Sequence, residues 1–210
     1  LIHNAVERIT PVPCNVIREK YGLEKDSYIL YVGRISPEKG PQDLLEAYQK
    51  LRLQERLVLA GPIPETEFGK EMTQKIDADP RVIRTGLVQG QELAELFSNC
   101  RLFVLPSHTE GLSLALLEAM SCVGRCLVSD IPANTVITKQ YGAEFEAENI
   151  DSLAAALSKE LTTPKDEELL KQEMEYVKEN FDYDAVIEWH EDVYKCALNR
   201  KNEKRWEQNC

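Results

Sequence analysis

Short apolar runs alternate with amphipathic segments along the first two thirds of the chain. The runs have the length of β-strands and lie at residues 28–32, 56–60, 82–83, 102–105 and 126–129. Between them apolar residues recur at helical spacing, and a loop with Asp130, Pro132 and Asn134 is expected after the last run. Each parallel crossover needs a helix to return the chain, so this alternation predicts a parallel sheet covered on both faces. The expected fold is an α/β, Rossmann-like, doubly wound parallel sheet.

The pattern becomes helical alone from about Asn149 onward. Asn149 and either Asp182 or Asp184 are the predicted N-caps of these segments, because their side chains can accept from free backbone N–H groups. Residues 149–198 are therefore expected to be helices appended to the sheet. Residues 199–210 carry many charges and little apolar periodicity, which predicts a charged tail with an exposed or frayed end.

Composition narrows the class of protein. A hydrophobic fraction of 43% in 210 residues fits a globular domain. The net charge of -11 argues against a nucleic-acid partner, because phosphate backbones need a concentrated basic patch. Six scattered cysteines, with Cys122 and Cys126 as the one close pair, indicate buried, reduced thiols of a cytosolic protein rather than metal ligands. No apolar stretch approaches the roughly 18 residues of a membrane span.

Two basic side chains and two glycines follow the first apolar run, in the sequence Gly-Arg-Ile-Ser-Pro-Glu-Lys-Gly at residues 33–40. Gly33 would permit close approach of the backbone to a ligand, while Arg34 and Lys39 could hold a diphosphate. The motif is neither G-x-G-x-x-G nor a Walker P-loop, so it does not favour a nicotinamide dinucleotide or a nucleoside triphosphate. Taken alone, it is explained as well by ordinary basic residues at a surface turn.

Glu110 and Glu118 stand eight residues apart around a predicted apolar helix. Residues 109–111 are expected to open this helix, so that its free N–H groups would join Arg34 and Lys39 in one anion site. Eight residues of helix rise about 12 Å, more than the roughly 5–9.5 Å between paired glycosidase carboxylates. The spacing therefore favours binding of two hydroxyl-bearing parts of one long ligand over proton transfer. A simple N-terminal charge for Glu110 and a solvent-facing position for Glu118 are the structural alternatives.

Together these residues resemble glycosyltransferase family 4, the retaining, nucleotide-sugar-dependent enzymes of the GT-B fold. The E-x7-E signature is Glu110 to Glu118, and residues 1–27 resemble a lead-in between two domains. The match covers residues 1–198, which would be the carboxyl-terminal, nucleotide-sugar-binding half of such an enzyme. We expect the amino-terminal acceptor domain to be missing upstream of Leu1. The remaining motifs are Gly33-Arg34, Lys39-Gly40, Ala60-Gly61-Pro62, Pro106-Ser107, Leu117 to Met120, Ser129-Asp130 and Tyr183-Asp184.

The resemblance implies a role for each matching residue. Arg34 and Lys39 would bind the donor diphosphate, Glu110 the donor sugar and Glu118 the ribose hydroxyls, with Arg34, Lys39 and Glu110 as the catalytic residues. Gly33 would add a donor contact. Backbone groups of Gly111 and Leu112 would lie by the phosphates and the sugar. The base would be bordered, largely through the backbone, by residues around Gly61 and by Val82, Ile83 and Arg84. The resemblance also implies an enzyme that uses no cofactor and needs no essential metal, as is usual for the GT-B fold.

Two departures from the family pattern leave the charged roles untouched. Residues 121–126 lack the proline that usually precedes the next strand, and Leu112 and Ser113 stand where one residue is commonly proline.

The resulting hypothesis is a cytoplasmic hexosyltransferase that moves a sugar from a nucleoside-diphosphate sugar to a saccharide or lipid-linked acceptor. The pathway would be polysaccharide or glycoconjugate synthesis, with peripheral membrane association as an option for the full-length enzyme. The alternative is a noncatalytic Rossmann-like module that binds a nucleotide or a sugar phosphate. Without an acceptor wall, the isolated chain is expected to bind donor weakly and to transfer nothing.

Overall fold

The computed structural model describes residues 5–122 and 125–207, and of residues 199–207 only the backbone. Three predictions fall partly outside these ranges: the start of the lead-in, the chain before the last predicted strand at residues 123–124, and the end of the tail. The six strands of the described sheet are β1 (Tyr28–Val32), β2 (Arg56–Ala60), β3 (Val82–Gly86), β4 (Leu102–Leu105), β5 (Cys126–Ser129) and β6 (Ala143–Phe145).

All neighbouring strands pair in parallel, in the order β3-β2-β1-β4-β5-β6. This is the order of the doubly wound Rossmann fold, so the predicted fold class is confirmed. The chain winds outward in one direction from β1 and in the other from β4. The switch point between these two neighbours is where ligands bind in such sheets, beyond the carboxyl ends of the strands.

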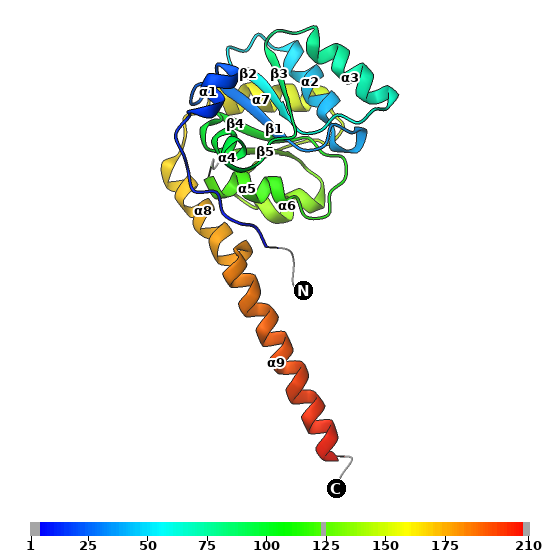
Figure 1. The fold of residues 1–210 in the computed structure, drawn as a ribbon, viewed down its shortest axis with the longest axis vertical. Coiled ribbons are helices and arrows are strands. Elements are labelled where there is room, and N and C mark those ends of the chain that lie inside the picture. Colours follow the sequence, from blue (N-terminus) through cyan, green and yellow to red (C-terminus); the bar gives the residue numbers. More distant parts are fainter. Residues whose placement is uncertain (1–4, 123–124, 208–210) are drawn as a thin grey trace.

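Alternate strand residues feed two separate cores. Leu30 and Phe103 belong to one core, while their neighbours Ile29 and Leu102 belong to the other, because successive side chains point to opposite faces of a sheet. One face is covered by α2 (Pro41–Lys50), α3 (Glu67–Asp77) and α7 (Ile150–Thr162). The other is covered by α1 (Val16–Tyr21), α4 (Gly90–Asn99), α5 (Leu114–Cys122), α6 (Pro132–Thr138) and α8 (Glu167–Phe181) (Figure 1).

The carboxyl-terminal part is helical, as predicted. Asn149 caps α7 by accepting from the Ser152 N–H at 3.0 Å, which confirms one predicted N-cap. The last helix, α9 (Tyr183–Glu207), extends away from the sheet domain (Figure 1). It passes through residue 198 without a break, so the backbone of the predicted charged tail is helical as far as Glu207. Within the described residues, no helix is both long and apolar enough to cross a membrane.

Candidate functional site

The loops after β1 and β4 meet at the switch point of the sheet. Gly40 has a φ of 66°, and a Cβ atom there would lie 2.0 Å from the Pro106 carbonyl oxygen. The His108 N–H donates to the Glu38 carbonyl at 3.0 Å, and His108 Nε2 lies 2.6 Å from Asp43 Oδ2. Only a glycine fits at position 40, so the two loops are held together by close packing as well as by hydrogen bonds.

Lys39 and Glu110, predicted to belong to one site, form an ion pair. Lys39 Nζ lies 2.7 Å from Glu110 Oε2, and the two side chains are 24% and 7% exposed. The other carboxylate oxygen accepts from Ser107 Oγ at 2.7 Å. Both oxygens of a nearly buried carboxylate are thus engaged, which offsets the cost of removing the charge from water.

Glu110 does not begin a helix. Helix α5 begins at Leu114, and the Ser113 hydroxyl accepts from the Leu116 N–H at 3.3 Å in the manner of an N-cap. The prediction that residues 109–111 open the helix is therefore wrong. Glu110 belongs to the loop after β4, and its position is set by Ser107 and Lys39 instead of by a helix dipole.

Arg34 follows β1 and is exposed, and in the described part of the chain its side chain makes no ion pair. Its carbonyl accepts from the Tyr31 hydroxyl at 2.8 Å. Burial raises the pKa of Tyr31, so this phenol remains a donor. The backbone here is crowded, because a Cβ atom on Gly61 would lie 1.9 Å from the Gly33 carbonyl oxygen. The guanidinium of Arg34 is left available for an anion.

Glu118 lies on α5 and faces a cavity of about 410 Å³. Burial raises the pKa of its carboxyl, and among the described residues the side chain has neither an ion-pair nor a hydrogen-bond partner. A half-buried, unpartnered carboxylate of this kind is suited to accept hydrogen bonds from ligand hydroxyls. The other residues that line the cavity are Glu7, Arg8, Ile9, Thr10, Gly90, Leu93 and Ala94.

The lead-in segment thus forms one wall of the Glu118 cavity. The Val6 N–H donates to the Phe181 carbonyl at 2.8 Å, and the Ile9 N–H donates to Ser121 Oγ at 3.1 Å. Arg8 forms an ion pair with Asp182, the residue between α8 and α9. The part of the lead-in that the structure describes is therefore attached to the domain at Val6, Arg8 and Ile9.

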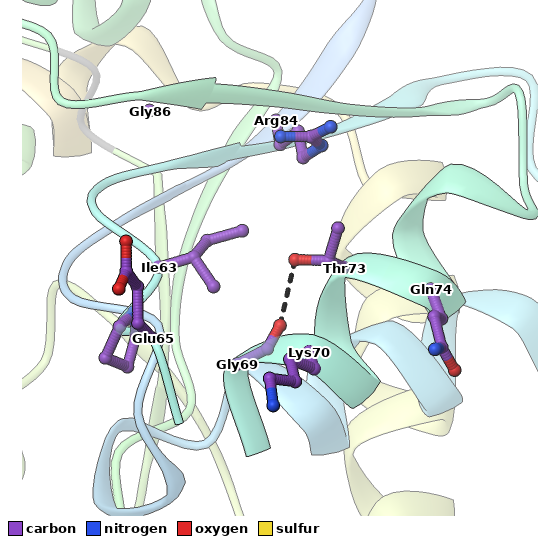
Figure 2. Close-up of a pocket in the computed structure, with 9 residues that line it drawn as sticks. Ile63, Glu65, Gly69, Lys70, Thr73, Gln74, Arg84 and Gly86 are labelled. Atoms are coloured by element: carbon purple, nitrogen blue, oxygen red, sulfur yellow. Dashed lines mark hydrogen bonds between the residues drawn. The ribbon is translucent and has the colours of Figure 1, made fainter. Parts of the chain in front are cut away.

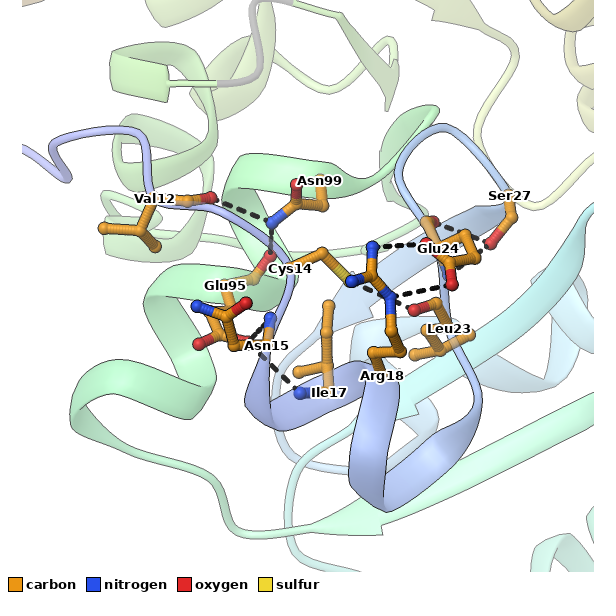
Figure 3. Close-up of polar contacts among 10 residues, drawn as sticks. All are labelled: Val12, Cys14, Asn15, Ile17, Arg18, Leu23, Glu24, Ser27, Glu95 and Asn99. Carbon is orange, nitrogen blue, oxygen red and sulfur yellow. Dashed lines mark hydrogen bonds and ion pairs between the residues drawn. The ribbon is translucent and has the colours of Figure 1, made fainter.

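Further along, two buried residues of α4 hold the segment that enters α1 (Figure 3). Glu95 Oε2 accepts from the N–H groups of Asn15 and Ile17 at 2.9 and 3.1 Å, and Asn99 Nδ2 donates to the Val12 carbonyl at 3.0 Å. These hydrogen bonds lower the pKa of Glu95 against the opposing effect of desolvation. The sequence gives no local signal for this contact.

The residues predicted to border a base lie after β2 and along β3. Gly61 lies at the carboxyl edge, where its N–H donates to the Gly86 carbonyl at 2.9 Å. Val82 is buried at the amino end of β3, and Ile83 follows it. At the usual rise per strand residue, Val82 lies about 13 Å from Gly86 at the other end of the strand. The contacts of residues 82–84 with a base stay predictions, but Gly86 is closer to the ligand-binding edge.

Arg84 lines a second cavity, of about 550 Å³, between α3 and the ends of β2 and β3 (Figure 2). Its guanidinium pairs with Asp77, with Nε 2.8 Å from Oδ1. Lys70, Thr73 and Gln74 of α3 contribute to the same cavity. The salt bridge with Asp77 leaves Arg84 less available to an anion than Arg34.

Gly111 and Leu112 lie in the loop between Glu110 and α5. Gly111 is exposed, and a Cβ atom there would have no neighbour within 4 Å. Packing against the described chain therefore does not explain the glycine.

The described ranges contain no group of three or more His, Cys, Asp or Glu side chains that could hold a metal ion. The expectation of metal independence stays a prediction.

The sheet order defines an α/β domain of the Rossmann type, with a cationic loop and two carboxylates around its switch point. The family model described as glycosyl transferases group 1 matches residues 15–179. The chain therefore belongs to this glycosyltransferase family, as the sequence resemblance implied.

Relatives and solved structures agree with this assignment. O-antigen chain mannosyltransferase B of Escherichia coli is 29% identical over 157 residues, which cover 72% of this chain and 41% of that protein. The structure of sucrose-phosphate synthase from Thermosynechococcus elongatus matches with a TM-score of 0.80 at 25% identity. This match covers 95% of this chain and 53% of the synthase chain. Anabaena HepE, solved with UDP and glucose, has the same fold, with a TM-score of 0.78 at 19% identity. This match covers 94% of this chain and 56% of the HepE chain. The chain thus spans about half the length of the proteins it matches, or less.

Proposed function

We propose that this chain is the donor-binding half of a retaining glycosyltransferase that moves a sugar from a nucleoside-diphosphate sugar to a saccharide or lipid-linked acceptor. The observation that carries the proposal is the Lys39–Glu110 pair at the switch point, 2.7 Å between Nζ and Oε2, with the unpaired Arg34 on the same loop as Lys39. The relatives add support, since they include a mannosyltransferase of O-antigen chains and an α-D-kanosaminyltransferase.

The proposed chemistry assigns each charge a task. When the bond between the anomeric carbon and the diphosphate breaks, negative charge grows on the leaving diphosphate while the sugar becomes oxocarbenium-like. Arg34 and Lys39 would stabilise the diphosphate, because fixed cations aimed at developing charge lower the barrier. Glu110 would accept hydrogen bonds from sugar hydroxyls. Glu118 would accept from the ribose, whose hydroxyls supply the partners that its cavity lacks.

The remaining partners follow from the same proposal. The chain provides a donor site, so the acceptor would be bound by a second, amino-terminal domain of a longer enzyme. The enzyme would act in the cytoplasm, with peripheral membrane association when the acceptor is lipid-linked. Arg34 and Lys39 would neutralise the diphosphate without an essential metal or any other cofactor.

Calorimetric titration of the chain with UDP and with GDP tests the proposal. One of the two should bind saturably, and Arg34→Ala and Lys39→Ala should each weaken that binding about tenfold or more, because each removes a charge-assisted hydrogen bond. Lys50→Ala is the matched control, since Lys50 is a lysine of α2 that pairs with Asp151 at 2.8 Å. Absence of saturable binding, or equal affinity in all variants, would refute the proposal. Sugar transfer by a longer form of the protein would separate it from a noncatalytic binding module, which would stay silent.

A further inference from the structure

Three fully buried polar residues connect α6 to the candidate site. Ser107, Ser129 and Asn134 are each 0% exposed. Asn134 Nδ2 donates to Ser129 Oγ at 3.0 Å, and Ser129 Oγ donates to the Ser107 carbonyl at 2.5 Å. Ser107 Oγ in turn donates to Glu110 Oε1 at 2.7 Å. A chain of contacts therefore runs from α6, across the ends of β5 and β4, to the carboxylate that is proposed to meet the donor sugar. It consists of hydrogen bonds that are joined at Ser107 by the covalent structure of that residue.

The direction of every hydrogen bond in this chain is fixed. The Ser129 carbonyl can only accept, and Asn134 Nδ2 lies 3.3 Å from it, so the amide nitrogen faces Ser129. Ser129 Oγ accepts from the same nitrogen, which leaves its own hydrogen for the Ser107 carbonyl. Bonds aligned in this way strengthen one another, and the backbone of Ser107 is held in one orientation.

Packing alone does not account for Asn134. Its Oδ1 atom is buried and has no hydrogen-bond partner in the described part of the chain. Native cores rarely tolerate an unsatisfied polar atom, and an apolar residue of similar shape would avoid it. The retained amide therefore has its use in the donor bonds to Ser129.

Glu110 depends on this chain most when a donor is bound. In the free protein its carboxylate has two partners, Lys39 and Ser107. Under the proposed function Lys39 turns toward the diphosphate, so that the Ser107 hydroxyl remains as the contact that orients the carboxylate. The orientation of that hydroxyl follows from the Ser107 backbone, which Ser129 fixes.

We propose that Ser129 and Asn134 are positioning residues for Glu110, acting through Ser107, and that they strengthen recognition of the donor sugar without affecting recognition of the nucleoside diphosphate. The inference rests on the proposed function, because the contact between Glu110 and the sugar is part of that proposal. It concerns two fully buried residues: Asn134 lies on α6, and Ser129 is the last residue of β5.

The test compares two ligands on each variant by calorimetry. UDP and UDP-glucose form one pair and GDP and GDP-mannose the other, and the pair that wild type binds is used. Ser107→Ala, Ser129→Ala and Asn134→Ala should each raise the ratio of the sugar-nucleotide Kd to the nucleotide Kd about fivefold or more. The Kd of the nucleotide alone should stay within about twofold, since Arg34, Lys39 and Glu118 are unchanged.

Two controls separate positioning from a general loss of stability. Asn99→Ala also removes a buried amide donor, which bonds the Val12 and Glu95 carbonyls at 3.0 and 2.8 Å, but it should leave the ratio unchanged even where the melting temperature falls equally. Ser129→Thr keeps the hydroxyl and should keep the wild-type ratio. An unchanged ratio in Ser129→Ala and Asn134→Ala, or an equal rise in Asn99→Ala, would overturn the inference while nucleotide binding stands. Failure of wild type to bind either pair would instead refute the proposed function and this inference together.

Discussion

Lys39 Nζ and Glu110 Oε2 lie 2.7 Å apart across the junction of the β1 and β4 loops, with the carboxylate side chain only 7% exposed. The two residues come from segments 71 positions apart, so the contact is made by the sheet order. Each group holds the other in the absence of ligand. In the proposed complex they serve different parts of the donor, the diphosphate and the sugar.

The first prediction concerns the strength of this ion pair. A double-mutant cycle of Lys39→Gln and Glu110→Gln, measured by urea denaturation, gives the coupling free energy of the pair. We expect about 1–3 kcal/mol, because the Glu110 carboxylate is shielded from water. The matched control is Lys50 and Asp151, which are similarly close at 2.8 Å but 43% and 88% exposed. That pair should couple by less than about 1 kcal/mol. Equal coupling in the two cycles would contradict the prediction.

A second prediction concerns the lead-in wall of the Glu118 cavity. Asp182→Asn weakens the ion pair with Arg8 and should loosen the wall that Arg8 shares with Glu118. We expect the affinity for UDP or GDP to fall about threefold to tenfold, whereas inorganic pyrophosphate, which needs only the cationic loop, should bind as before. Asp184→Asn, on the exposed start of α9, is the control and should change neither affinity. A parallel loss for pyrophosphate would point to general destabilisation instead.

A third prediction contrasts two glycines of the site. Gly61→Ala should lower the free energy of unfolding by about 2–4 kcal/mol, because its φ is 150° and the new Cβ would meet the Gly33 carbonyl at 1.9 Å. Gly111→Ala should stay within about 0.5 kcal/mol of wild type, since no atom lies within 4 Å of the new Cβ. Urea denaturation measures both.

The Gly111→Ala variant also tests the predicted role of Gly111 in binding the donor. If its backbone lies by the phosphates and sugar, Gly111→Ala should bind the sugar nucleotide more weakly while it remains as stable as wild type. Unchanged stability together with unchanged affinity would remove Gly111 from the site.

Much of the site could be predicted from sequence because the rule that connects its parts is topological. Apolar runs at residues 28–32 and 102–105 are strands of one parallel sheet, so the residues that follow them share one edge. This was enough to bring Lys39 and Glu110 together. The start of α5 was misplaced because Leu112 and Leu116 continue the apolar pattern on both sides of Ser113, and the cap itself is a single hydroxyl.

The contacts that the sequence did not reveal are long-range or weak in pattern. Asn134 was expected in a loop but lies on α6, and its link to Glu110 passes through a backbone carbonyl, which leaves no trace in residue types. Glu95 reaches Asn15 across 80 positions. The edge strand β6 was missed because it has three residues with an exposed glutamate, Glu144, at its centre.

The last prediction concerns a buried carboxyl outside the site. Glu173 of α8 is 0% exposed, and neither of its carboxyl oxygens has a hydrogen-bond partner among the described residues. Burial raises its pKa from 4.5 to about 8. Between these two pH values the folded protein keeps a proton on Glu173 that the unfolded chain releases. The contribution of this group to the free energy of unfolding is therefore fully present below pH 4.5, and it is lost as the pH rises through about 8.

Replacement of Glu173 by Gln should make stability less dependent on pH. Wild type should lose up to about 1.4 kcal/mol of unfolding free energy per pH unit through this group between pH 5 and 8, and Glu173→Gln, which cannot ionise, should lack that slope. Urea midpoints at pH 5, 6, 7, 8 and 9 measure the difference. Glu179→Gln, at an exposed position of the same helix, should follow wild type. Coincident profiles for wild type and Glu173→Gln would mean that the carboxyl ionises in the folded protein without cost, and that a partner compensates its burial.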